Sequence, residues 1–453
     1  MLRESGPRED VTNTMDIDRL LTTLRRRFVL ISALNSLPIG IEVAVMIVLM
    51  DSRGLGLGVI GLIVALYGLT IVLLELPTGG LADHISRRGV LAVAAGIGAI
   101  AFGGAAIATT AWAFGILYLL LGVARALSSG PAEAWYVDTV KAAVDDADIR
   151  GGLAASQAAG AISLGIGTIS GGALALLPVF PDSGPVTALS APMLVAAMLN
   201  VALLVVVLIS MREPARPTTK ARFGALLADV PRTVASGLTL GIRNRILARL
   251  LLVVLPIGMA VKGLELLTPG RLLDLTGDAG TSVSAYGVIT AIGFAAIALG
   301  SALSGPLTSL MRGSSVRAAT VGTLIAALGL VALFATDGLK GNVSIAATGG
   351  GYAVMFLGLG LSGPVSADLV HHQVDSSQRA TVISVKSLIQ RGGGSLAALT
   401  LPMLAGAWTI PGAWLTVGML LAASAVLYIG TGHRRQAPAP ATEQIDPAVE
   451  SLV

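Results

Sequence analysis

The chain has 453 residues, of which 54% are hydrophobic and 12% are charged, and its formal net charge is +4. Soluble domains carry about 25% charged residues, so this composition excludes an ordinary soluble protein and indicates one that lies mostly in a bilayer. The absence of Cys excludes a disulfide framework and a thiolate metal site, and 4 scattered His form no metal cluster. We therefore expect neither a metal nor a cofactor.

The N-terminal segment, residues 1–27, is polar and mixed in charge over its first 24 positions. A secretory signal needs a basic start followed by a short apolar core, and that pattern is missing here. We expect this segment to be cytoplasmic and the first apolar run after it to stay in the mature protein as a membrane helix.

Twelve apolar runs follow, each long enough to cross the hydrocarbon core as a helix of about 17–25 residues. They are far longer than barrel strands of about 10 residues, so we predict an all-α membrane protein. The boundaries of the fourth and eleventh runs are the weakest, because both runs carry polar residues. The predicted spans are residues 28–50, 58–78, 89–108, 112–134, 151–177, 187–211, 246–268, 282–304, 315–336, 343–367, 380–404 and 410–430.

The basic residues are concentrated in every second predicted loop. With the N-terminus inside, the outer loops hold only Arg53, Arg271 and Lys340, and most other Lys and Arg fall in inner loops or the inner termini. Cytoplasmic loops carry such an excess, so both termini are expected in the cytoplasm. The Lys and Arg of the cytoplasmic loops and termini therefore account for the net positive charge of the chain. We expect no nucleic-acid partner.

The spans divide into two six-helix bundles, residues 28–211 and 246–431, joined by a cytoplasmic linker over 212–245. The linker is basic and weakly amphipathic, so it either lies on the anionic inner leaflet or is a flexible connector. The tail over 432–453 contains Pro and Ala in alternation and is expected to be disordered.

The two halves share local sequence. Ser129-Gly130-Pro131 near the fourth span has a counterpart in Ser362-Gly363-Pro364 near the tenth. The Gly-led loop after the eighth span places Ser309 where the first half has Asp83, so the acidic position is not kept in the second half.

The loop from Gly79 to Arg88 reads Gly-Gly-Leu-Ala-Asp-His-Ile-Ser-Arg-Arg between two apolar runs. It resembles the signature loop between helices 2 and 3 of the major facilitator superfamily. Gly79, Asp83, Arg87 and Arg88 match that pattern, while His84 and Ser86 stand where a basic residue and Gly are usual. The resemblance implies two pseudo-symmetric six-helix bundles and a secondary transporter that works by alternating access.

The same resemblance implies a conformational lock. In the family, the acid and the Arg of the signature loop join an acid near the inner end of helix 4 in a charge network. The candidate lock residues here are Gly79, Asp83, Arg87, Arg88, Glu133 and Asp138.

Charged residues inside spans cost about 2.5–3.5 kcal/mol each on insertion scales, so each one is a functional candidate. Glu42 follows Pro38 and Gly40 in the first span and is predicted to be a protonatable acid lining a central cavity, or else a structurally neutralised acid. Arg125 lies in Leu121–Gly130, which partly resembles the Arg-centred helix 4 motif of drug–proton antiporters. Because Arg keeps its proton, Arg125 would tune a facing acid such as Glu42, or form a structural ion pair.

The roles of the charged residues in the seventh and eleventh spans have alternative interpretations. Lys262 and Glu265 are three apart and read most simply as an intrahelical pair. Arg391, deep in the eleventh span, would bind a polar or anionic substrate group or pair with an acid. The candidate substrate-binding residues are Asn35, Glu42 and Arg391.

The fifth span contains Gly165-Ile166-Gly167-Thr168-Ile169-Ser170-Gly171-Gly172. This resembles the antiporter signature, with Thr168 in place of Pro. A Gly-rich face also serves any close helix packing.

By resemblance, the expected function is proton-coupled efflux of hydrophobic or drug-like molecules by a monomer in the plasma membrane. The alternatives are uptake or exchange of a small polar or anionic metabolite and, remotely, a membrane sensor that transports nothing. No phosphate-binding loop of the Gly-four residues-Gly-Lys-Ser/Thr type is present, so ATP-driven pumping by this chain is not expected, nor is an enzymatic activity. The expected partners are a small-molecule substrate, protons and the lipid bilayer.

Overall fold

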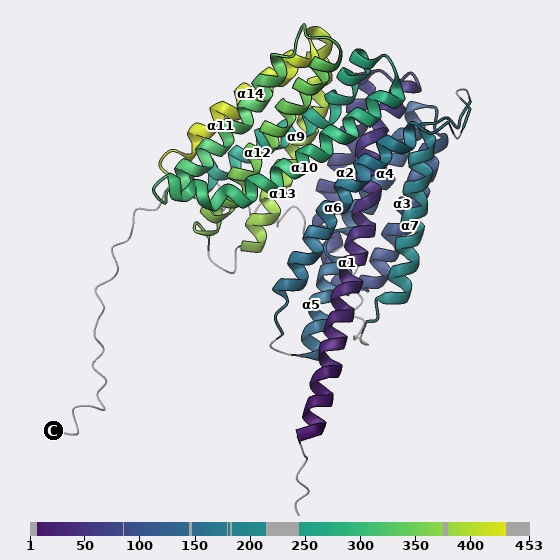
Figure 1. Ribbon diagram of the computed structural model, residues 1–453, viewed down its shortest axis with the longest axis vertical. Helices are drawn as coiled ribbons and strands as arrows, with labels where there is room; N and C mark the ends of the chain where they lie inside the picture. Colours follow the sequence, from purple (N-terminus) through teal and green to yellow (C-terminus); the bar gives the residue numbers. More distant parts are fainter. Residues whose placement is uncertain are drawn as a thin grey trace, which may run out of the picture.

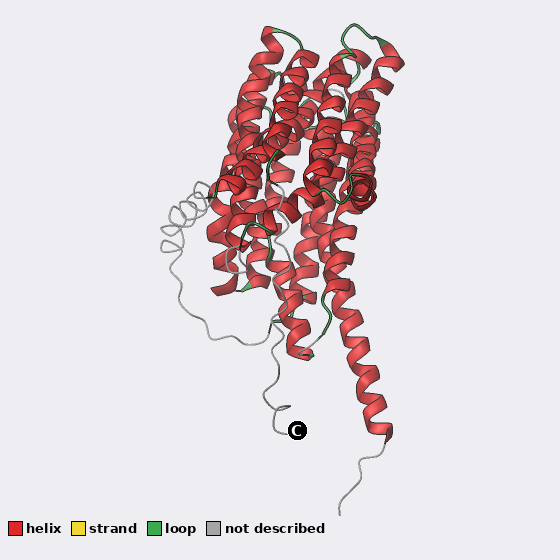
Figure 2. Cartoon of the chain, turned by 90° about the vertical axis from the view of Figure 1, so that its left-hand side faces the viewer, coloured by secondary structure: helices red, strands yellow, loops and turns green. Residues whose placement is uncertain are grey.

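The computed structural model describes the backbone of residues 7–84, 86–144, 147–178, 180–181, 184–213, 244–374 and 379–431, and the side chains of these residues except 7–18, 76–84 and 379–381. The linker beyond residue 213, the tail from residue 432 and the side chain of Asp83 lie outside the described part. Every regular element in the described residues is a helix (Figures 1 and 2). The elements are α1 (Pro7–Ser52), α2 (Leu57–His84), α3 (Arg87–Ile107), α4 (Ala111–Ser128), α5 (Pro131–Ala143), α6 (Arg150–Ala175), α7 (Ser190–Ser210), α9 (Arg245–Thr276), α10 (Ala279–Leu310), α11 (Ser315–Phe334), α12 (Gly341–His371), α13 (Arg379–Ala407), α14 (Ile410–Ser424) and the 3-10 turn η1 (Ala425–Tyr428).

Among the described residues, 11 helices are long and apolar enough to span a membrane. They correspond to all the predicted spans except the eleventh. That span is α13, which reaches 29 residues but carries Lys386, Gln390 and Arg391 in its first half. The helix nonetheless packs against α9 and α2, and the prediction of a helix there is confirmed.

The signature loop is shorter than the sequence suggests. Helix α2 continues through His84 and α3 begins at Arg87, so most of the expected loop from Gly79 to Arg88 is helical. The Ser86 hydroxyl accepts a hydrogen bond from the Gly89 N–H at 2.9 Å and thereby caps α3. A Ser where the resemblance expects Gly therefore has a local structural purpose, since Ser is a favoured N-cap residue.

The N-terminal segment is helical from Pro7, where α1 begins, and α1 runs for 46 residues. A helix of that length is about twice what a bilayer crossing requires. Its first part extends below the bundle in Figure 1.

The fourth predicted span is two helices, α4 and α5, separated at Ser129 and Gly130. Gly130 has φ of 98°, in the region that side chains disfavour, and Pro131 starts the next helix at a position where its missing N–H costs nothing. In the second half, Ser362-Gly363-Pro364 stays inside the continuous helix α12. The same tripeptide therefore separates two helices in the first half and lies within a single helix in the second.

The helix contacts repeat between the halves. In the first half α1 packs on α6, α2 on α4, and α3 on α4 and α7. In the second half α9 packs on α13, α10 on α12, and α11 on α12 and α14. Shifting each contact of the first half by six spans produces its counterpart in the second, so the two bundles share one architecture.

A short repeated sequence accounts for part of this symmetry. Leu-Pro-Ile-Gly occurs in α1 as residues 37–40 and in α9 as residues 255–258. A Cβ on Gly40 would overlap the backbone of α6 at Leu164 and Gly167, and one on Gly258 would overlap the backbone of α13 at Gln390. In both halves this glycine lets the helices of the first and fifth spans, α1 with α6 and α9 with α13, pack backbone to backbone.

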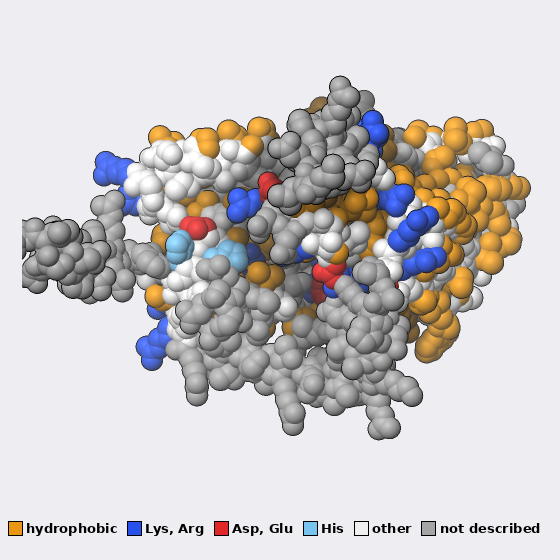
Figure 3. Space-filling view, turned by 90° about the horizontal axis from the view of Figure 1, so that it is seen from below, with side chains coloured by type: hydrophobic (Ala, Val, Ile, Leu, Met, Phe, Trp, Pro, Cys, Tyr) orange, Lys and Arg blue, Asp and Glu red, His pale blue; other side chains and the backbone are white. Residues whose placement is uncertain are grey.

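The halves meet near one end and diverge toward the end where α1 begins (Figure 1). We call the latter the basic end, since Figure 3 shows Lys and Arg side chains spread over it. Contacts between the halves include Gly172 of α6 against Ser284 of α10 and Gly61 of α2 against Ala398 of α13. Large apolar side chains such as Leu62, which is 60% exposed, cover the flanks, as expected for a lipid-facing surface.

Candidate substrate and proton-coupling site

A cavity of about 300 Å³ lies between the halves, lined by α2 from the first half and by α9 and α13 from the second. We call it the inter-half cavity. Part of its wall is apolar, and the rest is polar and charged. The polar and charged lining residues are Tyr67, Lys262, Glu265, Ser387, Gln390, Arg391 and Ser395.

Two ion pairs stand at this cavity. The Lys262 Nζ and Glu265 Oε2 atoms are 2.6 Å apart, so the predicted intrahelical pair exists, but it faces the cavity. The Arg391 Nε and Glu75 Oε2 atoms are 3.0 Å apart, and this pair joins α13 to α2 across the halves. Of the two alternatives for Arg391, pairing with an acid is the one observed.

Glu42 lies in a different cavity. It is only 9% exposed and lines a space of about 40 Å³ inside the first half, between α1, α2, α3, α4 and α7. Arg125, for which Glu42 was suggested as a facing acid, lines the same space, and so does Asn35. Tyr67 lines both cavities and is the link between them.

The groups that act on Glu42 come from two helices, α4 and α9. Tyr118 of α4 lies near its carboxylate. Arg125 of α4 and the Lys262–Glu265 pair of α9 are close enough to act on it through their charges. Glu42 is thus placed next to the inter-half cavity and sensitive to the charges around it.

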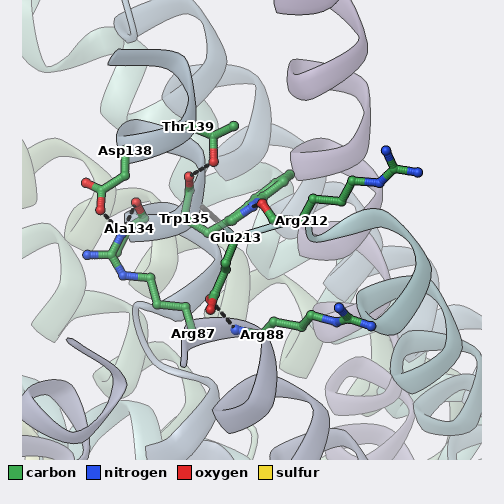
Figure 4. Close-up of polar contacts among 8 residues, drawn as sticks. All are labelled: Arg87, Arg88, Ala134, Trp135, Asp138, Thr139, Arg212 and Glu213. Atoms are coloured by element: carbon green, nitrogen blue, oxygen red, sulfur yellow. Dashed lines mark hydrogen bonds and ion pairs between the residues drawn. The ribbon is translucent and has the colours of Figure 1, made fainter. Parts of the chain in front are cut away.

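The candidate lock is partly assembled (Figure 4). The Arg87 guanidinium, 9% exposed, forms an ion pair with Asp138 at 2.5 Å and donates to the Ala134 carbonyl. These contacts tie the start of α3 to α5, as the resemblance implied for Arg87 and Asp138. Glu133 is exposed at the start of α5 and faces another cavity, described below.

Arg88 has contacts that the sequence did not indicate. Its backbone N–H donates to the Glu213 carboxylate at 2.7 Å, and its side chain donates to the Leu208 carbonyl at 2.6 Å. The Trp135 indole donates to the Arg212 carbonyl at 3.1 Å, as Figure 4 also shows. The end of α7 is therefore held against α3 and α5 where the chain enters the linker.

Sequence reasoning missed Glu75, Tyr67, Tyr118 and Gln390 as residues of the central region. Glu75 lies near the inner end of the second predicted span, and it reaches across to the second half. An acid inside a span was a usable signal for Glu75, since such residues are costly in lipid. Nothing in the local sequence distinguishes Tyr67 from other aromatic residues of the spans.

Two pseudo-symmetric six-helix halves around a central cavity are the arrangement of a membrane transporter with alternating access. The family model for the Major Facilitator Superfamily matches residues 28–398, and this chain belongs to that superfamily. It is accordingly a multi-pass membrane protein of a transporter family.

Solved structures with the same fold transport different cargoes. The nucleoside transporter NupG is 16% identical, with a TM-score of 0.70 over 90% of this chain and 98% of that one. A D-xylose–proton symporter is 15% identical, with a TM-score of 0.67 over 89% and 97%. A POT family transporter in complex with 5-aminolevulinic acid is 16% identical, with a TM-score of 0.65 over 90% and 95%. No curated protein matches the sequence.

Proposed function

We propose that this chain is a proton-coupled exporter of small drug-like molecules in which Glu42 carries the exchanged proton. The observation that best supports this role is the position of Glu42, 9% exposed among Tyr118, Arg125 and Tyr67 and beside the inter-half cavity. A carboxylate in such a place is costly when charged and gains strongly from protonation or from a nearby cation. A proton on Glu42 and a substrate in the inter-half cavity can therefore influence each other.

The inter-half cavity is the proposed substrate site. Val64, Ile71 and Val261 supply apolar contacts, and Glu265 and Arg391 supply charge. A mixed lining of this kind suits an amphiphilic molecule, with an apolar body and a polar or charged group.

Arg87 and Asp138 act as the conformational lock at the basic end.

We place the protein in the plasma membrane as a monomer, with the basic end and both termini in the cytoplasm. The excess of Lys and Arg at that end supports this orientation. Since the chain has no Cys, single Cys substitutions can be probed with impermeant thiol reagents in whole cells. Labelling of Ser309→Cys from outside intact cells would contradict the orientation.

The test uses ethidium as the transported probe in proteoliposomes with an imposed pH gradient. Glu42→Gln removes the titratable group but keeps its size, so gradient-driven ethidium transport should be lost while the protein still folds and inserts. Glu42→Asp, which keeps a carboxyl group, should retain part of the activity. Full gradient-driven transport by Glu42→Gln would refute the assignment of Glu42.

A second candidate is uptake or exchange of a small polar or anionic metabolite. It is favoured by Lys262 and Arg391, two cationic groups that line the inter-half cavity. The two candidates differ in the direction of flux and in the charge of the cargo. A panel of cationic, zwitterionic and anionic compounds, tested with the gradient in each direction, separates them.

A further inference from the structure

The first half contains two adjoining cavities. The upper one, of about 40 Å³, includes Glu42, and the lower one, of about 350 Å³, lies between α1, α3, α4, α5 and α6. Asn35, Arg125 and Ser128 line both of them. The inter-half cavity shares only Tyr67 with the upper cavity and has no lining residue in common with the lower one.

The lower cavity begins at the basic end. Glu133, exposed at the start of α5, and Gln157, exposed on α6, line it there. Ser156, buried next to Gln157 on α6, shares a hydrogen bond at 2.5 Å with the Ser32 hydroxyl of α1. The cavity therefore has polar groups from its exposed edge to its inner end.

One face of α1 continues this polar line to Glu42. Ser32, Asn35 and Glu42 are spaced three and seven positions apart, which places them on one side of a helix. Asn35 and Glu42 are separated by about 10 Å along the axis. A cavity of about 40 Å³ has room for water, and water needs the polar partners that Asn35, Ser128 and Glu42 provide.

We propose that Glu42 exchanges its proton with the solution at the basic end through these two cavities, within the first half, while substrate occupies the inter-half cavity. This inference rests on the proposed function, because it assumes that Glu42 carries the proton. It separates the route of the proton from the route of the cargo, and Tyr67 is the residue at which the two come together.

The chemistry is a proton transfer without change of any heavy-atom bond. On uptake, a proton leaves a hydronium ion at the exposed edge and passes along hydrogen-bonded waters. The Ser128 oxygen accepts a hydrogen bond from one of these waters, while its own O–H is donated to the Arg125 carbonyl. The proton ends as the O–H bond of the Glu42 carboxyl group, and release is the reverse. Asn35 orients the water without changing its own protonation.

The charges that face Glu42 set when the transfer occurs. Arg125 of α4 keeps its proton and favours ionised Glu42, as does Lys262 of α9. Glu265 of α9 opposes ionisation, and the hydroxyls of Tyr67 and Tyr118 also face the site. A cationic substrate beside Glu265 would shift this balance toward ionised Glu42 and so promote proton release.

The test follows the Glu42 carboxyl group itself by infrared spectroscopy of protein in liposomes. The carbonyl stretch that disappears in Glu42→Gln is assigned to Glu42, and its shift after transfer to D₂O reports access to solvent. Asn35→Leu combined with Ser128→Ala makes the shared boundary of the cavities apolar, so the shift should slow by about tenfold or more. Ser170→Ala, which removes a hydroxyl bonded to Ile166 on the outer side of α6, is the matched control and should leave the rate unchanged.

A second measurement blocks the lower cavity without touching its polar groups near Glu42. Gln157→Cys in this Cys-free chain can be modified with a bulky thiol reagent from the basic end, and the modification should slow exchange at Glu42. Gln390→Cys, at the inter-half cavity, is the comparison. Ethidium should protect Gln390→Cys from the reagent and leave Gln157→Cys unprotected.

The outcomes are separable. Exchange at the unchanged rate in both Asn35→Leu/Ser128→Ala and modified Gln157→Cys overturns the separate proton route and leaves Glu42 as the carrier. Slower exchange on modification of Gln390→Cys alone places the proton in the inter-half cavity and also overturns it. If no infrared band is lost in Glu42→Gln, Glu42 holds no proton and the proposed function itself fails.

Discussion

Glu75 and Arg391 are 316 positions apart, and they form an ion pair at 3.0 Å that joins the two halves of the molecule. The pair lies beside the inter-half cavity, with side chains 22% and 31% exposed. A movement that separates α2 from α13 at this point would break the pair. It is therefore positioned to regulate access to the cavity.

The first prediction concerns this pair. Arg391→Gln should widen the separation of the halves at the basic end, because it removes the cationic partner from a largely buried carboxylate. Partial exposure reduces the effect below that of a fully buried pair. Distances between spin labels at Gly151→Cys and Ser309→Cys measure the separation.

Exchanging the charges is the control for that variant. Glu75→Arg with Arg391→Glu retains an ion pair, so its distance distribution should return toward that of the unchanged protein. Labels at Gly56→Cys and Gly406→Cys, where added side chains meet nothing within 4 Å, report on the opposite end. Identical distributions in Arg391→Gln and the unchanged protein would contradict the role of the pair.

The second prediction concerns Lys262 and Glu265, whose charges neutralise each other at the cavity wall. Lys262→Met makes Glu265 available to a cationic cargo, and Glu265→Gln removes the acid. The KM for ethidium should fall in the first variant and rise in the second, each by up to about tenfold, or about 1.4 kcal/mol. A shift in the same direction in both variants would show that ethidium does not contact this pair.

The third prediction tests backbone packing in the first half. Gly167→Ala should destabilise the protein by about 1–3 kcal/mol, because the added methyl overlaps the backbone of α1 at Leu37 and Gly40. Gly165→Ala, two residues earlier in α6, meets nothing within 4 Å and should be neutral or slightly stabilising. Thermal unfolding in detergent compares the two, and equal midpoints would contradict the packing argument.

The fourth prediction concerns the Arg87–Asp138 contact. Asp138→Asn should lower the free energy of unfolding by about 1–3 kcal/mol, because buried Arg87 loses a charged acceptor. It should also shift the populations of inward- and outward-open states. Spin labels at Gly151→Cys and Ser309→Cys detect this shift. Lys141→Gln, an exposed change near the end of α5, is the control and should alter neither quantity.

Much of the fold could be predicted from the sequence. The long apolar runs correspond to long helices, because a backbone in lipid must satisfy its own hydrogen bonds. The repeat could have been seen more sharply in Leu-Pro-Ile-Gly at residues 37–40 and 255–258 than in the Ser-Gly-Pro pairs. The former has the same role in both halves, whereas the latter breaks a helix in one half alone.

The candidate site was only partly predictable. Glu42, Arg125 and Arg391 stand out in sequence because a charge inside an apolar span is costly. Their partners do not, since depth along a helix says nothing about which neighbour a side chain faces. Glu42 was expected at the central cavity and lies in one within the first half, and no sequence pattern indicated that Glu75 meets Arg391.

Taken alone, the amino-acid sequence determined the class of this protein, the number of its spans and its division into two halves. Those properties depend on hydrophobicity and helical rise, which are local and additive along the chain. Only the tertiary structure decided that Glu42 and Arg391 belong to different cavities and that α2 and α13 join the halves through an ion pair. Contacts between residues hundreds of positions apart depend on how whole helices pack, and no local pattern encodes them.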